Sequence, residues 1–228
     1  MKKLLEKFEG KISVQLTIRQ WLVISVTFSL CLLIVRMIMS ARLSYGFLAW
    51  NLFLAFVPYF ISEWLGSHQK ILRNRVKLFS SIFAWLLFMP NSFYILTDLF
   101  HLETAGNAHP WFDLTLILSF AWNGILLGVL SIQKMETLLK KTKGKFISVF
   151  VIGAVMWLNA FGIYIGRFLR FNSWDIFINP FSLLSEIASI LFSPYDYRYA
   201  WAMSLCFTGF MVIVYYTMKK LSEAFKNS

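Results

Sequence analysis

Charged residues are scarce in this chain of 228 residues. Asp, Glu, Lys and Arg together make up 14% of it, whereas about 25% is usual for a soluble domain. Apolar residues make up 58%, and the mean hydropathy is +0.65. A chain of this size cannot bury so much apolar surface in one water-soluble core. The composition therefore excludes a soluble globular protein and predicts a protein that lies in a lipid bilayer.

Cysteine and histidine are also rare, and no catalytic fingerprint is present. Cys31 and Cys206 lie in apolar runs, far from any CxxC spacing, so we expect small buried apolar residues and not redox groups. The chain has no GxSxG elbow, no phosphate-binding P-loop and no dinucleotide-binding glycine motif. No cofactor is therefore evident from its motifs.

Long apolar runs, in contrast, are abundant. Six runs each approach the roughly 20 helical residues that cross a bilayer. They are continuous and not alternating, which favours helices over barrel strands. The runs are residues 21–39, 46–65, 78–96, 111–132, 146–165 and 199–218. The sequence predicts an all-α polytopic membrane helix bundle of about six transmembrane helices, as a single integral membrane domain over residues 1–228.

A shorter apolar run, residues 180–192, is predicted to lie on the membrane surface. Asn179-Pro180 is typical of a helix start, with Asn179 as the cap, and Ser193-Pro194 ends the run. The run is too short to span a bilayer, and its apolar residues recur on one face. We expect a short amphipathic helix on the outer face of the membrane.

The positive charges alternate between the two sides of the predicted bundle. Of 22 Lys and Arg, 17 fall on the side that holds both termini, and 5 fall on the other side. The positive-inside rule then predicts a multi-pass protein of the cell (plasma) membrane with cytoplasmic N- and C-termini. This distribution accounts for the net charge of +11. The expected partners are the lipid bilayer and, at the cytoplasmic loops, anionic lipid head groups, and not nucleic acid.

Polar side chains gather at the outer ends of the third and fourth spans. Pro90 would kink the third span, and Asn91, Asp98 and His101 follow it. On a continuing helix these three side chains would share one face. Asp113 lies just inside the fourth span. Asp98, His101 and Asp113 are therefore the candidate catalytic residues.

One hypothesis for this cluster is a divalent metal site. Carboxylate and imidazole groups suit zinc or manganese. Asp98 and His101 would be the central ligands, with Asp113 and either Glu103 or His109 beside them. The chain has no HExxH or equivalent spacing, so the signal lies only in the residue types.

A second hypothesis concerns the connection after the fifth span. Arg167 and Arg170 oppose the positive-inside trend and need a reason, such as pairing with carboxylates or holding an anionic group. With Asn172, Asp175 and Asn91 they are candidate substrate-binding residues for a lipid-linked phosphate or carboxylate. The structural alternative is a network of ion pairs and hydrogen bonds that joins the outer helix ends.

Four further polar side chains lie in the spans. Asn51, Asn123 and Asn159 are expected to form hydrogen bonds between helices, with a polar permeation path as the functional alternative. Glu63 is expected to pair with basic residues of the loop that follows it.

Two pairs of glycines match the small-residue pattern of close helix packing. They are Gly124 with Gly128 in the fourth span, and Gly162 with Gly166 in the fifth. Each pair predicts a close neighbour, which is either another helix of the same chain or a second copy in a homo-oligomer.

Two stretches resemble a known family. They are Phe88-Met-Pro-Asn-Ser-Phe-Tyr-Ile-Leu-Thr-Asp-Leu-Phe-His-Leu102 and Gly166-Arg-Phe-Leu-Arg-Phe-Asn-Ser-Trp-Asp175, with Trp111-Phe-Asp-Leu between them. These blocks are similar to those of an uncharacterised bacterial family of polytopic integral membrane proteins, catalogued as a domain of unknown function. The resemblance covers about residues 40–218. It implies a multi-span architecture and no catalytic assignment.

Three functions remain open from the sequence. The first is a small transporter, with polar side chains lining a path. The second is a membrane-embedded enzyme that acts on a lipid or lipid-linked anionic substrate at the outer leaflet. The third is a structural or partner-binding membrane subunit. All three place any polar site on the extracytoplasmic face.

Overall fold

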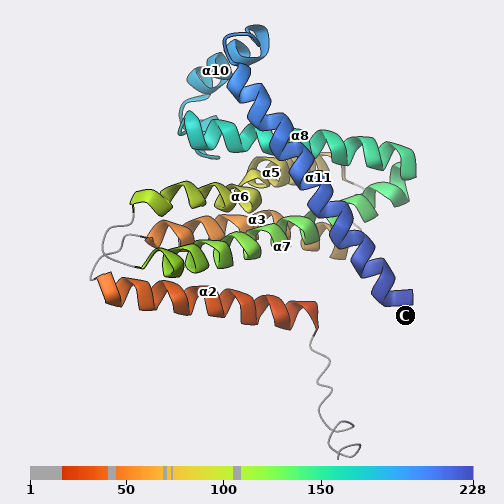
Figure 1. Ribbon diagram of the computed structural model, residues 1–228. Coiled ribbons are helices and arrows are strands. Elements are labelled where there is room, and N and C mark those ends of the chain that lie inside the picture. Colours follow the sequence, from red (N-terminus) through yellow and green to blue (C-terminus); the bar gives the residue numbers. More distant parts are fainter. Residues whose placement is uncertain (1–16, 41–44, 69–70, 73, 105–108, 228) are drawn as a thin grey trace, which may run out of the picture.

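The computed structural model describes residues 17–40, 45–68, 71–72, 74–104 and 109–227, and every regular element in these ranges is a helix (Figure 1). The elements are α2 (Ile18–Ser40), α3 (Gly46–Ser67), α5 (Arg75–Phe88), α6 (Pro90–Tyr94), the 3-10 helix η1 (Ile95–Thr104), α7 (Pro110–Lys143), α8 (Lys145–Phe168), α9 (Asp175–Ile178), α10 (Pro180–Phe192) and α11 (Arg198–Asn227).

Within the residues that the structure describes, six segments are long and apolar enough to cross a membrane. They are α2, α3, the combined segment Arg75–Leu102, α7, α8 and the part Arg198–Ala224 of α11. The predicted all-α bundle of six spans is confirmed, and so is the short apolar helix α10 with its predicted bounds. Pro180 takes the first helical position as expected, but the Asn179 side chain makes no capping hydrogen bond.

The predicted loop between the fourth and fifth spans is helical. Helix α7 continues to Lys143, and Gly144 alone separates it from α8. Residues 133–143 are rich in strong helix formers, and the lysines of the last turn suit the negative helix end. Gly144 has a φ of 85°, which a residue without Cβ adopts freely, so the chain turns at this position.

The third span is interrupted where the sequence predicts a kink. Helix α5 ends at Phe88, and Pro90 starts the separate helix α6, because proline has no N–H to continue the ladder. Beyond Tyr94 the chain forms the 3-10 helix η1 and not a continuing α-helix. In a 3-10 helix residues three apart eclipse. Asp98 and His101 therefore share a face, although the helix that carries them is not the α-helix that the prediction assumed.

Helix α6 is held on one side by the first glycine pair. A Cβ added to Gly124 would lie 2.4 Å from the carbonyl oxygen of Ser92. A Cβ added to Gly128 would lie 2.6 Å from the ring of Phe93. Only glycine lets α7 approach α6 this closely.

The second glycine pair holds the opposite side of α6. A Cβ added to Gly162 would lie 2.7 Å from the Pro90 ring, and one added to Gly166 would lie 3.2 Å from the Tyr94 ring. Both glycine pairs thus face the same short helix of their own chain. The close neighbour that the glycine spacing predicts is therefore a helix of the same chain.

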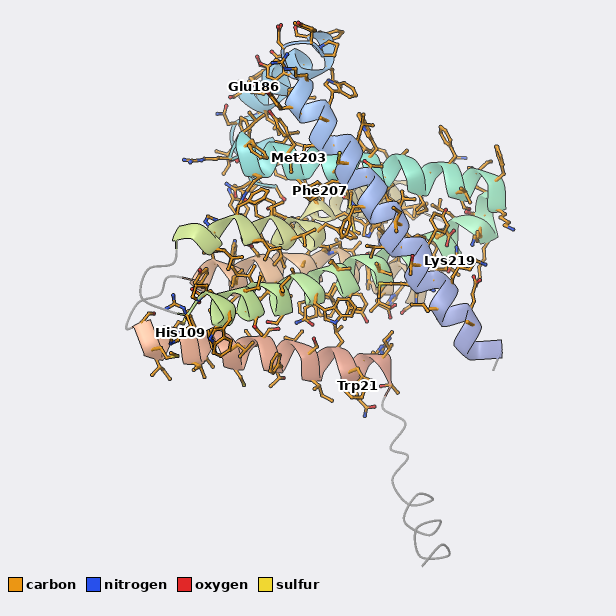
Figure 2. All side chains as sticks on the ribbon, viewed as in Figure 1. Trp21, His109, Glu186, Met203, Phe207 and Lys219 are labelled. Carbon is orange, nitrogen blue, oxygen red and sulfur yellow. The ribbon has the colours of Figure 1, made fainter. Side chains whose placement is uncertain are left out.

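The helices bring polar side chains together at two ends of the bundle. In Figure 1, α2, α3, α6 and α7 lie side by side, and α11 crosses α8 obliquely. We call the region around the end of η1 and the start of α7 the Asp98 end, and the region around the last turns of α7 and α11 the Glu136 end. Figure 2 shows His109 at the first of these ends and Trp21 and Lys219 at the other.

Much of the bundle surface is apolar, as contact with lipid requires. Large side chains such as Phe146 and Phe181 are more than four-fifths exposed. Cys31 and Cys206 are exposed as well, so the expectation that they are buried is wrong. A small apolar side chain has no need of burial where the surroundings are themselves apolar.

Candidate functional site

The Asp98 carboxylate is the centre of the polar cluster at its end of the bundle. Its side chain is buried, and each oxygen has a partner from a different helix. Asn51 Nδ2 of α3 donates to Oδ2 at 2.9 Å, and Arg167 Nη1 of α8 donates to Oδ1 at 3.2 Å. The predicted convergence of Asp98 and Arg167 is therefore present in the structure.

Arg167 is held by several contacts. Its Nη2 donates to the backbone carbonyl of Thr97 at 2.6 Å. Its guanidinium lies 5.7 Å from the centroid of the Tyr94 ring and 5.5 Å from that of Phe100. A planar cation between two rings and a carboxylate is strongly fixed in orientation. Arg167 therefore joins α8 to η1.

Asp113 has its own arginine, in a second buried pair. Arg36 of α2 donates to both Asp113 oxygens, through Nε at 2.5 Å and Nη2 at 3.1 Å. The Tyr45 hydroxyl lies 3.4 Å from Oδ2. Burial raises the pKa of Tyr45, and the Asp113 charge raises it further, so the phenol stays protonated as a donor. Sequence reasoning missed this pair, although an arginine inside an apolar run was the available signal.

The two histidines of this region lie in different surroundings. The His101 ring packs on Phe47 of α3 with the ring centroids 5.1 Å apart. His109 is exposed just before α7, and the Glu103 side chain lies outside the described residues. In the described part of the chain, no three His, Cys, Asp or Glu side chains gather into a group that could hold a metal. The metal hypothesis stays a prediction.

The connection after α8 begins with a backbone conformation that is unusual for a side-chain-bearing residue. Arg170 has a φ of 60°, the left-handed region that glycine prefers, and this costs about 1–3 kcal/mol. The Asn172 backbone N–H donates to Asp175 Oδ2 at 2.6 Å. Arg170 and Asn172 are exposed. Because α8 ends at Phe168, Arg170 does not continue the helix face of Arg167.

The same connection is attached to the broken third span. Asn91 Nδ2 donates to the Ser173 hydroxyl at 3.1 Å and to the Phe88 carbonyl at 3.0 Å. The Ser173 hydroxyl in turn donates to the Leu87 carbonyl at 3.2 Å. The interruption at Pro90 frees carbonyl groups near this point, and the contacts satisfy two of them.

A cavity of about 380 Å³ lies beside these contacts. Ligand sites of about 300–1,000 Å³ with mostly apolar walls are typical of proteins. Buried Leu54, Phe161 and Leu183 line it from three helices, and Phe83 and Leu158 line it while remaining exposed on the bundle surface. Exposed lining residues mark an opening, so the cavity is open between α5 and α8. Asn51, Asn91, Tyr94, Asn172 and Ser173 supply polar atoms at the Asp98 end. Trp50 and Asn172 of the lining are exposed as well, so the polar end is also open.

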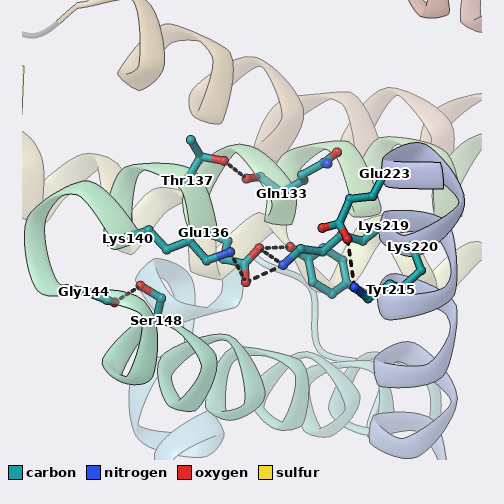
Figure 3. A network of polar contacts seen from close by, with 10 residues as sticks. All are labelled: Gln133, Glu136, Thr137, Lys140, Gly144, Ser148, Tyr215, Lys219, Lys220 and Glu223. Carbon is teal, nitrogen blue, oxygen red and sulfur yellow. Dashed lines mark hydrogen bonds and ion pairs between the residues drawn. The ribbon is translucent and has the colours of Figure 1, made fainter. Parts of the chain in front are cut away.

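A third buried carboxylate, missed in the sequence, lies at the opposite end (Figure 3). Glu136 of α7 accepts from the Tyr215 hydroxyl at 2.7 Å and from Lys219 Nζ at 2.6 and 2.8 Å. Lys140, one turn later, lies 3.1 Å from it. These contacts attach α11 to α7. The cavity lining includes none of these residues.

Two of the three asparagines of the spans join helices. Asn123 donates to the Ser25 carbonyl and the Ser29 hydroxyl of α2, and Asn51 joins α3 to η1, as predicted. Asn159 Nδ2 is buried without a partner among the described residues.

Among the described residues, Glu63 pairs with Arg19 of α2 at 2.7 Å and with Lys134 of α7 at 3.0 Å. Lys70 and Arg73 of the loop that follows Glu63 lie outside the described residues, so the predicted pairing with that loop stays a prediction. The two observed partners belong to other helices, which local sequence does not reveal.

Together, the six apolar helices and their buried polar ties define a multi-pass helical membrane protein. The chain matches the family described as "protein of unknown function (DUF1361)" over residues 50–214, and it belongs to that family. The expected membership of a domain-of-unknown-function family is confirmed. A search of curated proteins found no match, and neither did a search of solved structures.

Proposed function

We propose that this protein lies in the cell membrane with both termini in the cytoplasm and binds a lipid or lipid-linked molecule in the outer half of the bilayer. The orientation is supported by the charge asymmetry between the two sides. The Asp98 end would then face the outside, and α10 would lie in the outer interface.

The cavity is the observation that carries the binding proposal. It has apolar walls, a mouth beside the exposed Phe83 and Leu158, and polar side chains at one end. An amphiphile matches this arrangement, because its tail can enter from the bilayer and its head can reach Asn91 and Asn172. A binding protein or carrier for such a molecule is therefore the best-supported function.

Catalysis on a lipid-linked anionic substrate has no specific contact in its favour. The Asp98 oxygens are bonded to Asn51 and Arg167, and Arg167 is engaged by Asp98 and Thr97. Arg170 is the candidate that remains for an anionic group, because it is exposed and has no ion pair within the described ranges. It would contact such a group outside the cavity.

The test is a substitution that fills the cavity mouth, followed by a count of the lipids that remain bound to the protein. The protein is purified in mild detergent and examined by native mass spectrometry. Leu158→Trp should weaken lipid retention about tenfold, since overpacking costs about 1–3 kcal/mol. The control is Leu205→Trp on α11, which is similarly exposed but does not line the cavity. Equal lipid retention in both variants would contradict the proposal and indicate surface lipid alone.

A further inference from the structure

The polar lining of the cavity carries no charge. Among the described residues that line it there is no Asp, Glu, Lys, Arg or His. The polar lining consists of Trp50, Asn51, Asn91, Tyr94, Asn172 and Ser173. An ionised group that leaves water is costly to bury unless an opposite charge pairs with it. A charged head group therefore finds no counter-charge inside this cavity.

Two of the asparagines already use amide N–H groups within the chain. Asn51 donates one N–H of Nδ2 to Asp98 and keeps the second, whereas Asn91 donates both, to Phe88 and Ser173. Their Oδ1 atoms accept no hydrogen bond from the described residues. An amide oxygen can only accept a hydrogen bond, and so can an ionised phosphate or carboxylate. These oxygens favour a ligand that donates and disfavour an anion.

Donors lie in the same cavity. The Tyr94 hydroxyl and the Trp50 indole N–H have no hydrogen-bond partner among the described residues. The Asn172 side chain adds an amide with both donor and acceptor atoms. Of the common lipid head groups, a hydroxyl group matches this mixture, because it donates and accepts at one atom.

We infer that the head group inside the cavity is uncharged and bears hydroxyl groups, on an apolar tail that extends to the mouth beside Leu158. This inference rests on the proposed function and narrows its substrate class. Two sources share the chemistry, a glycerolipid with a free hydroxyl and a glycolipid with a sugar. Any anionic group of the ligand lies beyond the cavity, at Arg170.

The test compares lipids that differ only in their heads. The full chain is stripped of lipid in detergent and titrated with dioleoylglycerol, its monoglucosyl derivative and dioleoyl phosphatidic acid, with native mass spectrometry as the readout. At least one of the two uncharged lipids should bind about tenfold or more tightly than phosphatidic acid. A site specific for a sugar should bind the glucosyl lipid more tightly than dioleoylglycerol. A site specific for the glycerol hydroxyl should bind dioleoylglycerol more tightly.

A single-atom change checks the contact directly. Tyr94→Phe removes one hydroxyl and should weaken the preferred uncharged lipid about three- to tenfold, the effect of one neutral hydrogen bond. Tyr59→Phe is the control, because Tyr59 lies in α3 but does not line the cavity.

Phosphatidic acid binding as tightly as the uncharged lipids, or an unchanged affinity in Tyr94→Phe, overturns the inference. If Leu158→Trp still blocks that binding, the proposed lipid site stands. If none of the three lipids binds, both the site and its chemistry fail.

Discussion

The two ends of the bundle hold their buried carboxylates in different ways. At the Asp98 end, Asp113 and Asp98 each pair with an arginine, and the Arg36 and Asp113 side chains are 4% and 1% exposed. At the Glu136 end the cations are lysines, and Lys140 is 34% exposed. Arginine fixes geometry through a planar fork, whereas lysine is a flexible point charge. The Asp98–Arg167 tie contacts the cavity lining through Asn51 and Tyr94, and the lysine ties lie at the end with the basic surface.

The largest effect should follow the loss of Arg36. In Arg36→Met the Asp113 charge stays buried without its partner, which costs about 3–5 kcal/mol of unfolding free energy. Thermal unfolding of the protein in detergent, followed by tryptophan fluorescence, measures the loss. The double variant Arg36→Met, Asp113→Leu should recover most of it, because no charge is left buried. If Arg36→Met is as stable as the original protein, the Arg36–Asp113 pair does not stabilise the fold.

A smaller loss of unfolding free energy is expected at a closely packed glycine, Gly124, than at Arg36. Gly153, which has open space beside it, serves for comparison. Gly124→Ala places a methyl group against the Ser92 carbonyl and should cost about 1–3 kcal/mol. Gly153→Ala, whose new Cβ meets nothing within 4 Å, should add about 0.5–1 kcal/mol through helix propensity. Unfolding in the same detergent compares the two. If the two substitutions change the unfolding free energy equally, whether they raise or lower it, the close packing around α6 does not contribute to stability.

The smallest effect is expected at the Glu136 end. Lys219→Met leaves Glu136 with Lys140 and Tyr215, so the cost should be about 1 kcal/mol. This difference should shrink as salt is added, because partly exposed charges are screened. Unfolding at low and high ionic strength provides the measurement. A loss as large as that of Arg36→Met would remove the distinction between the two ends.

The parts of this fold that depend on local sequence could be predicted from it. Continuous apolar runs identified six spans, and Pro90 identified the break in the third. The glycine spacing predicted close packing, although not that both pairs face α6. The charge alternation placed Asp98 and Arg167 on one side, and the structure brings their atoms to 3.2 Å.

The missed features all depend on which helices are neighbours. Arg36 and Asp113 are 77 residues apart, and Lys219 and Glu136 are 83 apart. An acid and a base so distant in sequence have no periodicity that links them. The cavity was missed for the same reason, since its lining comes from six helices and a connection.

Helix α6 gives the cavity one wall that resists deformation. Asn91 and Tyr94 face the cavity, while Ser92 and Phe93 press on glycines that have no side chain to move aside. Another part of the lining comes from α10, a separate short helix whose buried residues are Leu183 and Ile190. Ligands of different size would therefore be accommodated by displacement of α10, whereas α6 would keep its position and limit which ligand shapes fit.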